Sequence, residues 1–157
     1  MAIWTVYFLA LLIGVVSGLR TMTPLAAVGW AAHFGALRLE GTWLAFLGAA
    51  IAPWILTVAV IAELVADQLP STPSRKTPVQ FGARIVSGAL CGASLGSAAG
   101  SWQIGAGVGA IGAIAGTLGG SDVRSRLAHV FRRDRAAAFI EDAVALVGAG
   151  LIVGVFG

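Results

Sequence analysis

Long apolar stretches without charge make up most of this chain and restrict what it can fold into. No Asp, Glu, Lys, Arg or His lies between Arg84 and Asp122, and none precedes Arg20. Hydrophobic residues form 58% of the 157 positions and charged residues 11%, whereas a typical soluble domain carries about 25% charged residues. Because so few polar groups cannot cover a water-exposed surface, we expect lipid to surround most of the chain.

The length fits a single integral-membrane domain over residues 1–157. The start of the chain lacks a basic region and a small-residue cleavage site, so it is interpreted as a retained span rather than a signal peptide. The net charge of +3 does not predict nucleic-acid binding, because the basic residues gather in two loops where membrane topology explains them. Cys91 is the only cysteine, which excludes an internal disulfide and gives no metal signature. We expect no metal and no cofactor.

Six apolar segments predict an all-α membrane protein with about six glycine-rich transmembrane helices, some of them short or broken. The expected segments are 3–19, 23–35, 42–68, 82–100, 103–119 and 136–157. Thr23 and Pro24 are the expected cap and first residue of the second helix, and Pro53 is expected to kink the third. The second segment is short for the roughly 20 residues that a span needs. It either spans fully as a short helix, is re-entrant, or is fused with the first segment into one long broken helix.

The proline-containing stretch 71–81 predicts a linker between two halves, 1–70 and 82–157. Three spans in each half would enter the bilayer in opposite senses, which is the pattern of a 3+3 inverted repeat. A parallel alignment of Gly18-Leu19-Arg20 with Gly82-Ala83-Arg84 is the alternative form of internal symmetry.

Basic residues predict the orientation of the chain in the membrane. They concentrate in the stretches 71–81 and 121–135, which the positive-inside rule places in the cytoplasm, with both termini outside. The 121–135 stretch is also expected to contact anionic lipid. Four of the five tryptophans fall at predicted outer ends of segments and Trp54 falls mid-span, so they predict an aromatic belt at the outer interface.

Glycines spaced by four residues predict close helix packing. Such spacing places small residues on one helical stripe and lets two backbones approach, which is how helices associate in lipid. We expect the stripes to pack inside one subunit, with a homodimer face as the alternative and a homo-oligomer as the expected assembly. The residues of these stripes are Gly88, Gly92, Gly96, Gly100, Gly105, Gly109, Gly112 and Gly116.

Charged residues inside apolar segments are the candidate site. An unpaired charge at mid-membrane costs at least ~2.5 kcal/mol, so such groups usually face a partner or a cavity. The predicted depths bring these side chains to one cytoplasm-facing level, where they could bind a cation, relay protons or hold an anionic substrate. The alternative without a binding site is a set of interfacial charges that reach water and anchor helix ends. The candidates are Arg20, Glu63, Asp67, Arg84, Glu141 and Asp142.

Three stretches together are similar to a known family. They are Gly18-Leu19-Arg20-Thr21-Met22-Thr23-Pro24, the run from Glu63-Leu64-Val65-Ala66-Asp67 to Thr72-Pro73-Ser74-Arg75, and Ala83-Arg84-Ile85-Val86-Ser87-Gly88-Ala89. The chain resembles the small bacterial membrane proteins of the domain of unknown function DUF4126. The resemblance implies a multi-spanning protein of the bacterial inner membrane and supports testing the charged residues within the three stretches. It brings no activity.

These observations leave three classes of function open. The first is an ion or small-solute transporter or channel-like protein whose charged cluster is the site. The second is a membrane-embedded enzyme acting on lipid head groups, with carboxylates as acid and base and arginines holding phosphate. The third is a non-catalytic scaffold or assembly subunit. The sequence favours the first and leans against an enzyme.

Overall fold

The computed structural model describes residues 1–67, 77–131 and 134–157, and for residues 124–131 and 134–138 it describes the backbone alone. These parts of the chain contain helices and no strand, so the predicted all-α class is confirmed. The elements are α1 (Ile3–Leu19), α2 (Met22–His33), the short 3-10 helix η1 (Ala45–Gly48), α3 (Ala52–Ala66), α4 (Pro78–Ser97), α5 (Trp102–Phe131) and α6 (Asp134–Gly154).

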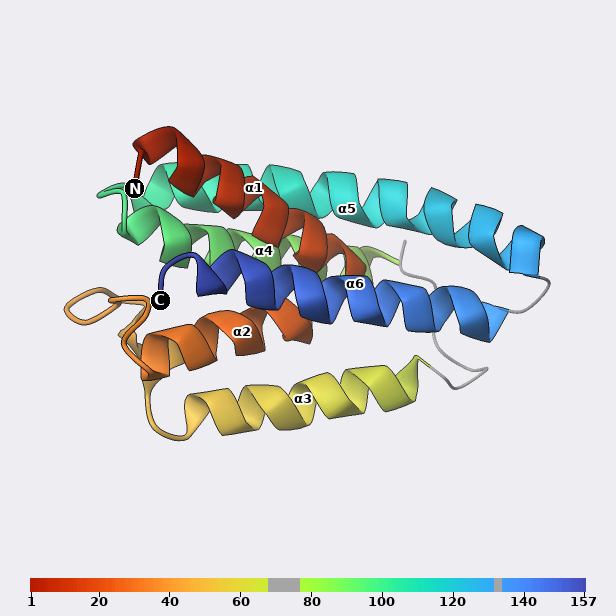
Figure 1. Ribbon diagram of the computed structural model, residues 1–157, viewed down its shortest axis with the longest axis horizontal. Helices are drawn as coiled ribbons and strands as arrows, with labels where there is room; N and C mark the ends of the chain where they lie inside the picture. Colours follow the sequence, from red (N-terminus) through yellow and green to blue (C-terminus); the bar gives the residue numbers. More distant parts are fainter. Residues whose placement is uncertain (68–76, 132–133) are drawn as a thin grey trace.

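The six α-helices run along one long axis and alternate in direction, so that both termini lie at the same end (Figure 1). The helix α1 packs against α4, α5 and α6, and its inward side chains from Val6 to Val16 form part of the buried core. Because α1 belongs to the first predicted half and α4 to α6 belong to the second, the two halves share one core. The end of α3 and the start of α4 lie at the end opposite the termini, as do the end of α5 and the start of α6.

The chain turns back between α1 and α2, which form a hairpin rather than one long broken helix (Figure 1). Arg20 ends α1 with an extended backbone, at φ −138° and ψ 125°, and α2 begins two residues later. The predicted cap at Thr23 and helix start at Pro24 are therefore wrong, because Thr21 is the cap and Pro24 stands third in the helix. Proline is tolerated there because first-turn N–H groups have no partner within the helix. With 12 residues, α2 is about 18 Å long.

The third helix is shorter than the sequence predicted. Residues 42–51 form turns and the 3-10 helix η1, and α3 begins at Ala52. Pro53 consequently stands in the first turn, where its fixed φ favours helix initiation, and the expected mid-helix kink is wrong. This start also brings Trp54 to the end of the molecule that holds the termini. The rings of Trp30 and Trp54 lie 5.0 Å apart and those of Trp43 and Trp102 lie 5.4 Å apart.

The fifth helix is longer than predicted, because α5 continues through Gly119 and Gly120 to Phe131. The expected basic loop over 121–135 is thus helical as far as Phe131, and residues 132 and 133 lie outside the described residues. Arginine, leucine and alanine favour helix in this stretch, and no proline interrupts it. The 71–81 linker lies outside the described residues up to Lys76, whereas Pro78 begins α4.

Seven of the eight predicted packing glycines line close helix contacts within the chain. A Cβ added at Gly92 or Gly96 of α4 would lie 2.8–2.9 Å from the Cα of a glycine on α5. On the next turns of α5, a Cβ at Gly112 or Gly116 would meet the backbone of α1 instead. Gly100 differs, because it lies in the turn after α4 with a φ of +76° and nothing near its Cβ position.

Large apolar side chains cover much of the outer surface of the described bundle. Only Pro53 and Val60 of α3 are buried. Exposed residues on three outward helix faces include Trp54, Ile55, Val58, Ile61, Val65, Ile104, Ile111, Leu118, Leu146, Val147 and Leu151. Within the described residues one helical stretch, Trp102–Val123, is long and apolar enough to cross a membrane, whereas α1 and α3 are apolar but shorter.

The glycine contacts predict a difference between two alanine substitutions. We expect Gly92→Ala to lower the free energy of unfolding by about 1–3 kcal/mol, because its methyl group would overlap backbone atoms of α5. Gly107→Ala on α5 is the matched control, since nothing lies within 4 Å of its Cβ position and alanine favours helix. Thermal unfolding of the purified variants measures both, and equal midpoints would contradict the observed packing.

Candidate functional site

A buried break in the helical backbone organises the candidate site. The hairpin between α1 and α2 leaves carbonyl and N–H groups that no helix satisfies, and buried backbone groups need partners. Arg84 of α4 donates through Nη1 to the carbonyl oxygens of Gly18 and Leu19 at 2.6 and 2.7 Å. Ser87, one turn along α4, donates to the carbonyl of Thr21 at 2.6 Å.

The fifth helix also supports the end of α1. The Thr117 hydroxyl lies 2.8 Å from the carbonyl of Ala113 on its own helix and 3.3 Å from the carbonyl of Gly18. Positive groups are favourable at a helix C-terminus because the exposed carbonyls carry partial negative charge. Arg84 therefore satisfies the last carbonyls of α1 by hydrogen bonding and by charge.

Glu63 of α3 supplies the complementary charge at the start of α2. Its Oε1 accepts the N–H of Thr21 at 2.8 Å and its Oε2 accepts the N–H of Met22 at 3.0 Å. The side chain of Thr21 makes no cap hydrogen bond, so the carboxylate of Glu63, on another helix, caps the N-terminus of α2. Negative charge is stabilised at a helix N-terminus. Both carboxylate oxygens of Glu63 thus bind backbone N–H groups.

Arg20 lies at the apex of the break and is fully buried. Its Nη1 donates to Oδ2 of Asp67, at the end of α3, at 2.6 Å. Its Nη2 binds Oδ1 of Asp142 on α6. One guanidinium consequently links α3 and α6 to the hairpin. We call Arg20, Glu63, Asp67, Arg84 and Asp142 the break cluster.

Burial makes the pairing in this cluster essential. Removing charges from water costs several kcal/mol per ion, and good pairing geometry must offset that cost. A charge-assisted hydrogen bond to an arginine fork is both short and directional, as the contact between Arg20 and Asp67 shows. The three carboxylates and two guanidiniums of the break cluster leave one excess negative charge when all five are ionised.

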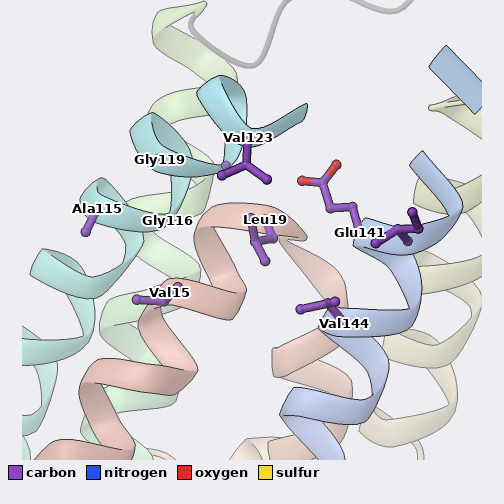
Figure 2. Close-up of a pocket in the computed structure, with 10 residues that line it drawn as sticks. Val15, Leu19, Ala115, Gly116, Gly119, Val123, Glu141 and Val144 are labelled. Atoms are coloured by element: carbon purple, nitrogen blue, oxygen red, sulfur yellow. The ribbon is translucent and has the colours of Figure 1, made fainter. Parts of the chain in front are cut away.

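Glu141 precedes Asp142 in sequence but faces a different space. It lines a groove of about 290 Å³ between α1, α5 and α6, otherwise formed by apolar side chains and glycines. Figure 2 shows the Glu141 side chain reaching from α6 toward α5, near Val123, with Leu19 of α1 between the two helices. Successive residues on a helix point about 100° apart, which separates Glu141 from the ion pairs of Asp142.

The structure thus brings five of the six predicted site residues to the helix break and leaves the sixth beside it. The sequence analysis did not identify Ser87 and Thr117 as site residues. A hydroxyl group in an apolar helix needs a hydrogen-bond partner, and this requirement could have indicated both residues. His33 lies at the other end of the bundle, with Nδ1 3.3 Å from the carbonyl oxygen of Gly48. Among the residues that the structure describes, no His, Cys, Asp and Glu side chains gather as a metal site.

The buried ion pairs predict a charge-compensation effect on stability. Arg20→Met would remove the guanidinium that binds both Asp67 and Asp142, so the free energy of unfolding should fall by about 3–5 kcal/mol. Adding Asp67→Asn and Asp142→Asn to that variant should recover much of the loss, because no uncompensated charge remains.

Chemical denaturation of the three proteins measures this recovery. Arg38→Met is the matched control, since Arg38 is an exposed arginine in the loop after α2 and its loss should change little. A triple variant no more stable than Arg20→Met would show that the two aspartates are not held by Arg20.

Comparison with known proteins gives one match. A family model described as a domain of unknown function (DUF4126) matches residues 7–155, which include the helix break, all of the break cluster and the groove. No curated protein and no solved structure matches the chain.

Proposed function

We propose that this chain, which belongs to the family described as domain of unknown function DUF4126, is an integral membrane protein that moves a small cation across the bilayer. The observation that carries the proposal is the buried ion-paired cluster at a discontinuity between two helices. Transporters commonly bind ions where helices are interrupted within the membrane, because the free helix ends present partial charges there.

The outer surface supports placement in lipid. Apolar side chains on α3, α5 and α6 are exposed over successive turns, and a monomeric soluble protein rarely exposes such continuous apolar faces. The stretch Trp102–Val123 is long enough to span, and α5 as a whole is about 45 Å long, more than the ~30 Å hydrocarbon core. The shorter α1 and α2 would then turn back inside the bilayer, which makes their hairpin re-entrant.

The arrangement of charges supports a cation as the transported species. Charged groups at membrane depth mark ion pathways and proton relays. Asp67 and Asp142 both pair with Arg20, so a proton or a small cation could replace Arg20 at either carboxylate. Such a replacement would loosen α3, whose C-terminal end is held to the hairpin through Glu63 and Asp67.

The same geometry gives less support to an enzyme acting on lipid head groups. Nη1 of Arg84 already binds two carbonyl oxygens, and Nη1 and Nη2 of Arg20 each bind a carboxylate, so these donors are engaged within the chain. A scaffold function can be distinguished by experiment. A scaffold would keep its assembly function when the charged residues are substituted, whereas a transporter would lose its flux.

Transport by purified protein in liposomes tests the proposal. We expect saturable flux of protons or of a monovalent cation, read by an internal dye, and a decrease of about tenfold or more with Asp67→Asn. That variant keeps the pair between Arg20 and Asp142, so it should fold. Glu63→Gln should also change the rate, whereas Glu40→Gln, an exposed carboxylate in the loop after α2, should not.

Absence of flux for every cation tested, with the protein folded and inserted, would overturn the transport proposal. Flux that is unchanged by Asp67→Asn and Glu63→Gln would remove the break cluster from the pathway.

Labelling tests the proposed orientation, in which the termini lie outside and the start of α4 lies inside. In a Cys91→Ser background, Glu40→Cys should react with an impermeant maleimide added to intact cells. Thr77→Cys should react only after the membrane is opened. The reverse pattern would invert the topology, and labelling of both from outside would contradict membrane insertion.

A further inference from the structure

The helix α3 lies at the edge of the bundle and is held more loosely than the helices of the core (Figure 1). Helices α1, α4 and α5 meet backbone to backbone at glycines, so a methyl group added at Gly92 or Gly116 would overlap a neighbouring backbone. By contrast, α3 packs mainly on α2 and η1, and only Pro53 and Val60 of its residues are buried. Its outward face carries large apolar side chains, which the proposed bilayer would surround. A movement of α3 away from α2 would thus displace lipid rather than another helix.

Close packing without charge fixes the N-terminal end of α3. Gly29 of α2 has no side chain at the point where η1 and α3 approach it. A Cβ there would lie 3.2 Å from both the carbonyl oxygen of Leu47 and Cδ1 of Leu56. Nε1 of Trp30, the next residue on α2, donates to Oγ1 of Thr57 at 3.0 Å. None of these contacts depends on an ionised group, so a proton or a cation leaves them in place.

Charged side chains hold the C-terminal end of α3. Glu63 accepts hydrogen bonds from the N–H groups of Thr21 and Met22. Asp67 accepts a hydrogen bond from Arg20, and we call the contacts of these two carboxylates with the hairpin the latch contacts. Lipid tails are as apolar as the side chains of α3, so apolar burial alone does not keep a helix beside its neighbour in a bilayer. The position of this end therefore depends on specific contacts that are sensitive to the charge of two carboxylates.

We propose that α3 is a hinged gate that turns about its N-terminal end, with Glu63 and Asp67 holding it closed. When a proton or a small cation takes the place of the latch contacts, the C-terminal end moves away from the hairpin and opens the break cluster. With 15 residues α3 is about 22 Å long, so a tilt of about 15° moves that end by about 6 Å. The inference rests on the proposed cation transport and identifies the part of the molecule that moves.

Distances between paired spin labels on the full chain in phosphatidylcholine nanodiscs test the hinge. A Cys91→Ser background leaves only the introduced cysteines to be labelled. The first pair, Val65→Cys on α3 and Val79→Cys on α4, reports on the end of the bundle that holds the latch contacts. The second pair, Ile55→Cys on α3 and Ile104→Cys on α5, reports on the opposite end. All four native side chains are exposed, so labels fit there without disturbing the core.

Removal of the latch contacts should move only one end of α3. We expect the combination of Glu63→Gln and Asp67→Asn to shift the first distance to longer values by up to about 6 Å and to leave the second unchanged. Glu63→Gln alone should give a smaller shift in the same direction, because the amide oxygen still accepts an N–H group. Glu40→Gln, which changes an exposed carboxylate in the loop after α2, is the control and should alter neither distance. An unchanged or shorter first distance, or equal shifts of both distances, would overturn the proposal.

The distance measurement needs no ion gradient, so its outcome is independent of transport. A chain that transports cations while both distances stay fixed in the latch variants would lose the hinge and keep the proposed function. A chain whose first distance alone lengthens, but which moves no cation, would keep the hinge and lose the proposed function.

Discussion

Unsatisfied backbone groups at the turn between α1 and α2 are the constraint on which the rest of the structure depends. A hairpin buried among other helices cannot leave its carbonyl and N–H groups to water, so neighbouring helices must supply partners. Arg84 and Ser87 come from α4, Thr117 from α5 and Glu63 from α3. The signs of the charges match the two helix ends, with a cation at the end of α1 and an anion at the start of α2. The turn thereby fixes the positions of three other helices.

Sequence reasoning located this region because charges are rare in apolar segments and therefore conspicuous. It identified all five members of the break cluster as candidates but did not fix which group each of them binds. Arg84 and Glu63 bind backbone atoms. Such partners cannot be predicted from residue types, because nearly every residue has the same backbone N–H and carbonyl groups. The pairing of Arg20 with both Asp67 and Asp142 depends on how α3 and α6 lie beside the hairpin, which is a property of packing rather than of local sequence.

The helix boundaries also depend partly on local sequence and partly on tertiary contacts. Pro53 was expected within a helix because the apolar run extends on both sides of it, yet the run before it folds into turns and η1. The start of α2 at Met22 depends on Glu63, which is distant in sequence. In α5, the sequence predicted an end at Gly119 with a basic loop after it, although the following residues favour helix and continue it. The groove could not be predicted from the sequence, because it depends on how the side chains of α1, α5 and α6 pack against one another.

All five tryptophans gather at the end of the bundle that holds the termini, since Trp54 begins α3 and Trp102 begins α5. The only tyrosine, Tyr7, stands near the start of α1 at that same end. Intrinsic fluorescence therefore reports on one extremity of the molecule, and the region around Arg20 is optically silent. A rearrangement of the ion pairs changes the tryptophan emission only if the helices themselves move and shift the indole rings at their far ends. The tryptophans therefore distinguish a change confined to the ion pairs from a movement of whole helices.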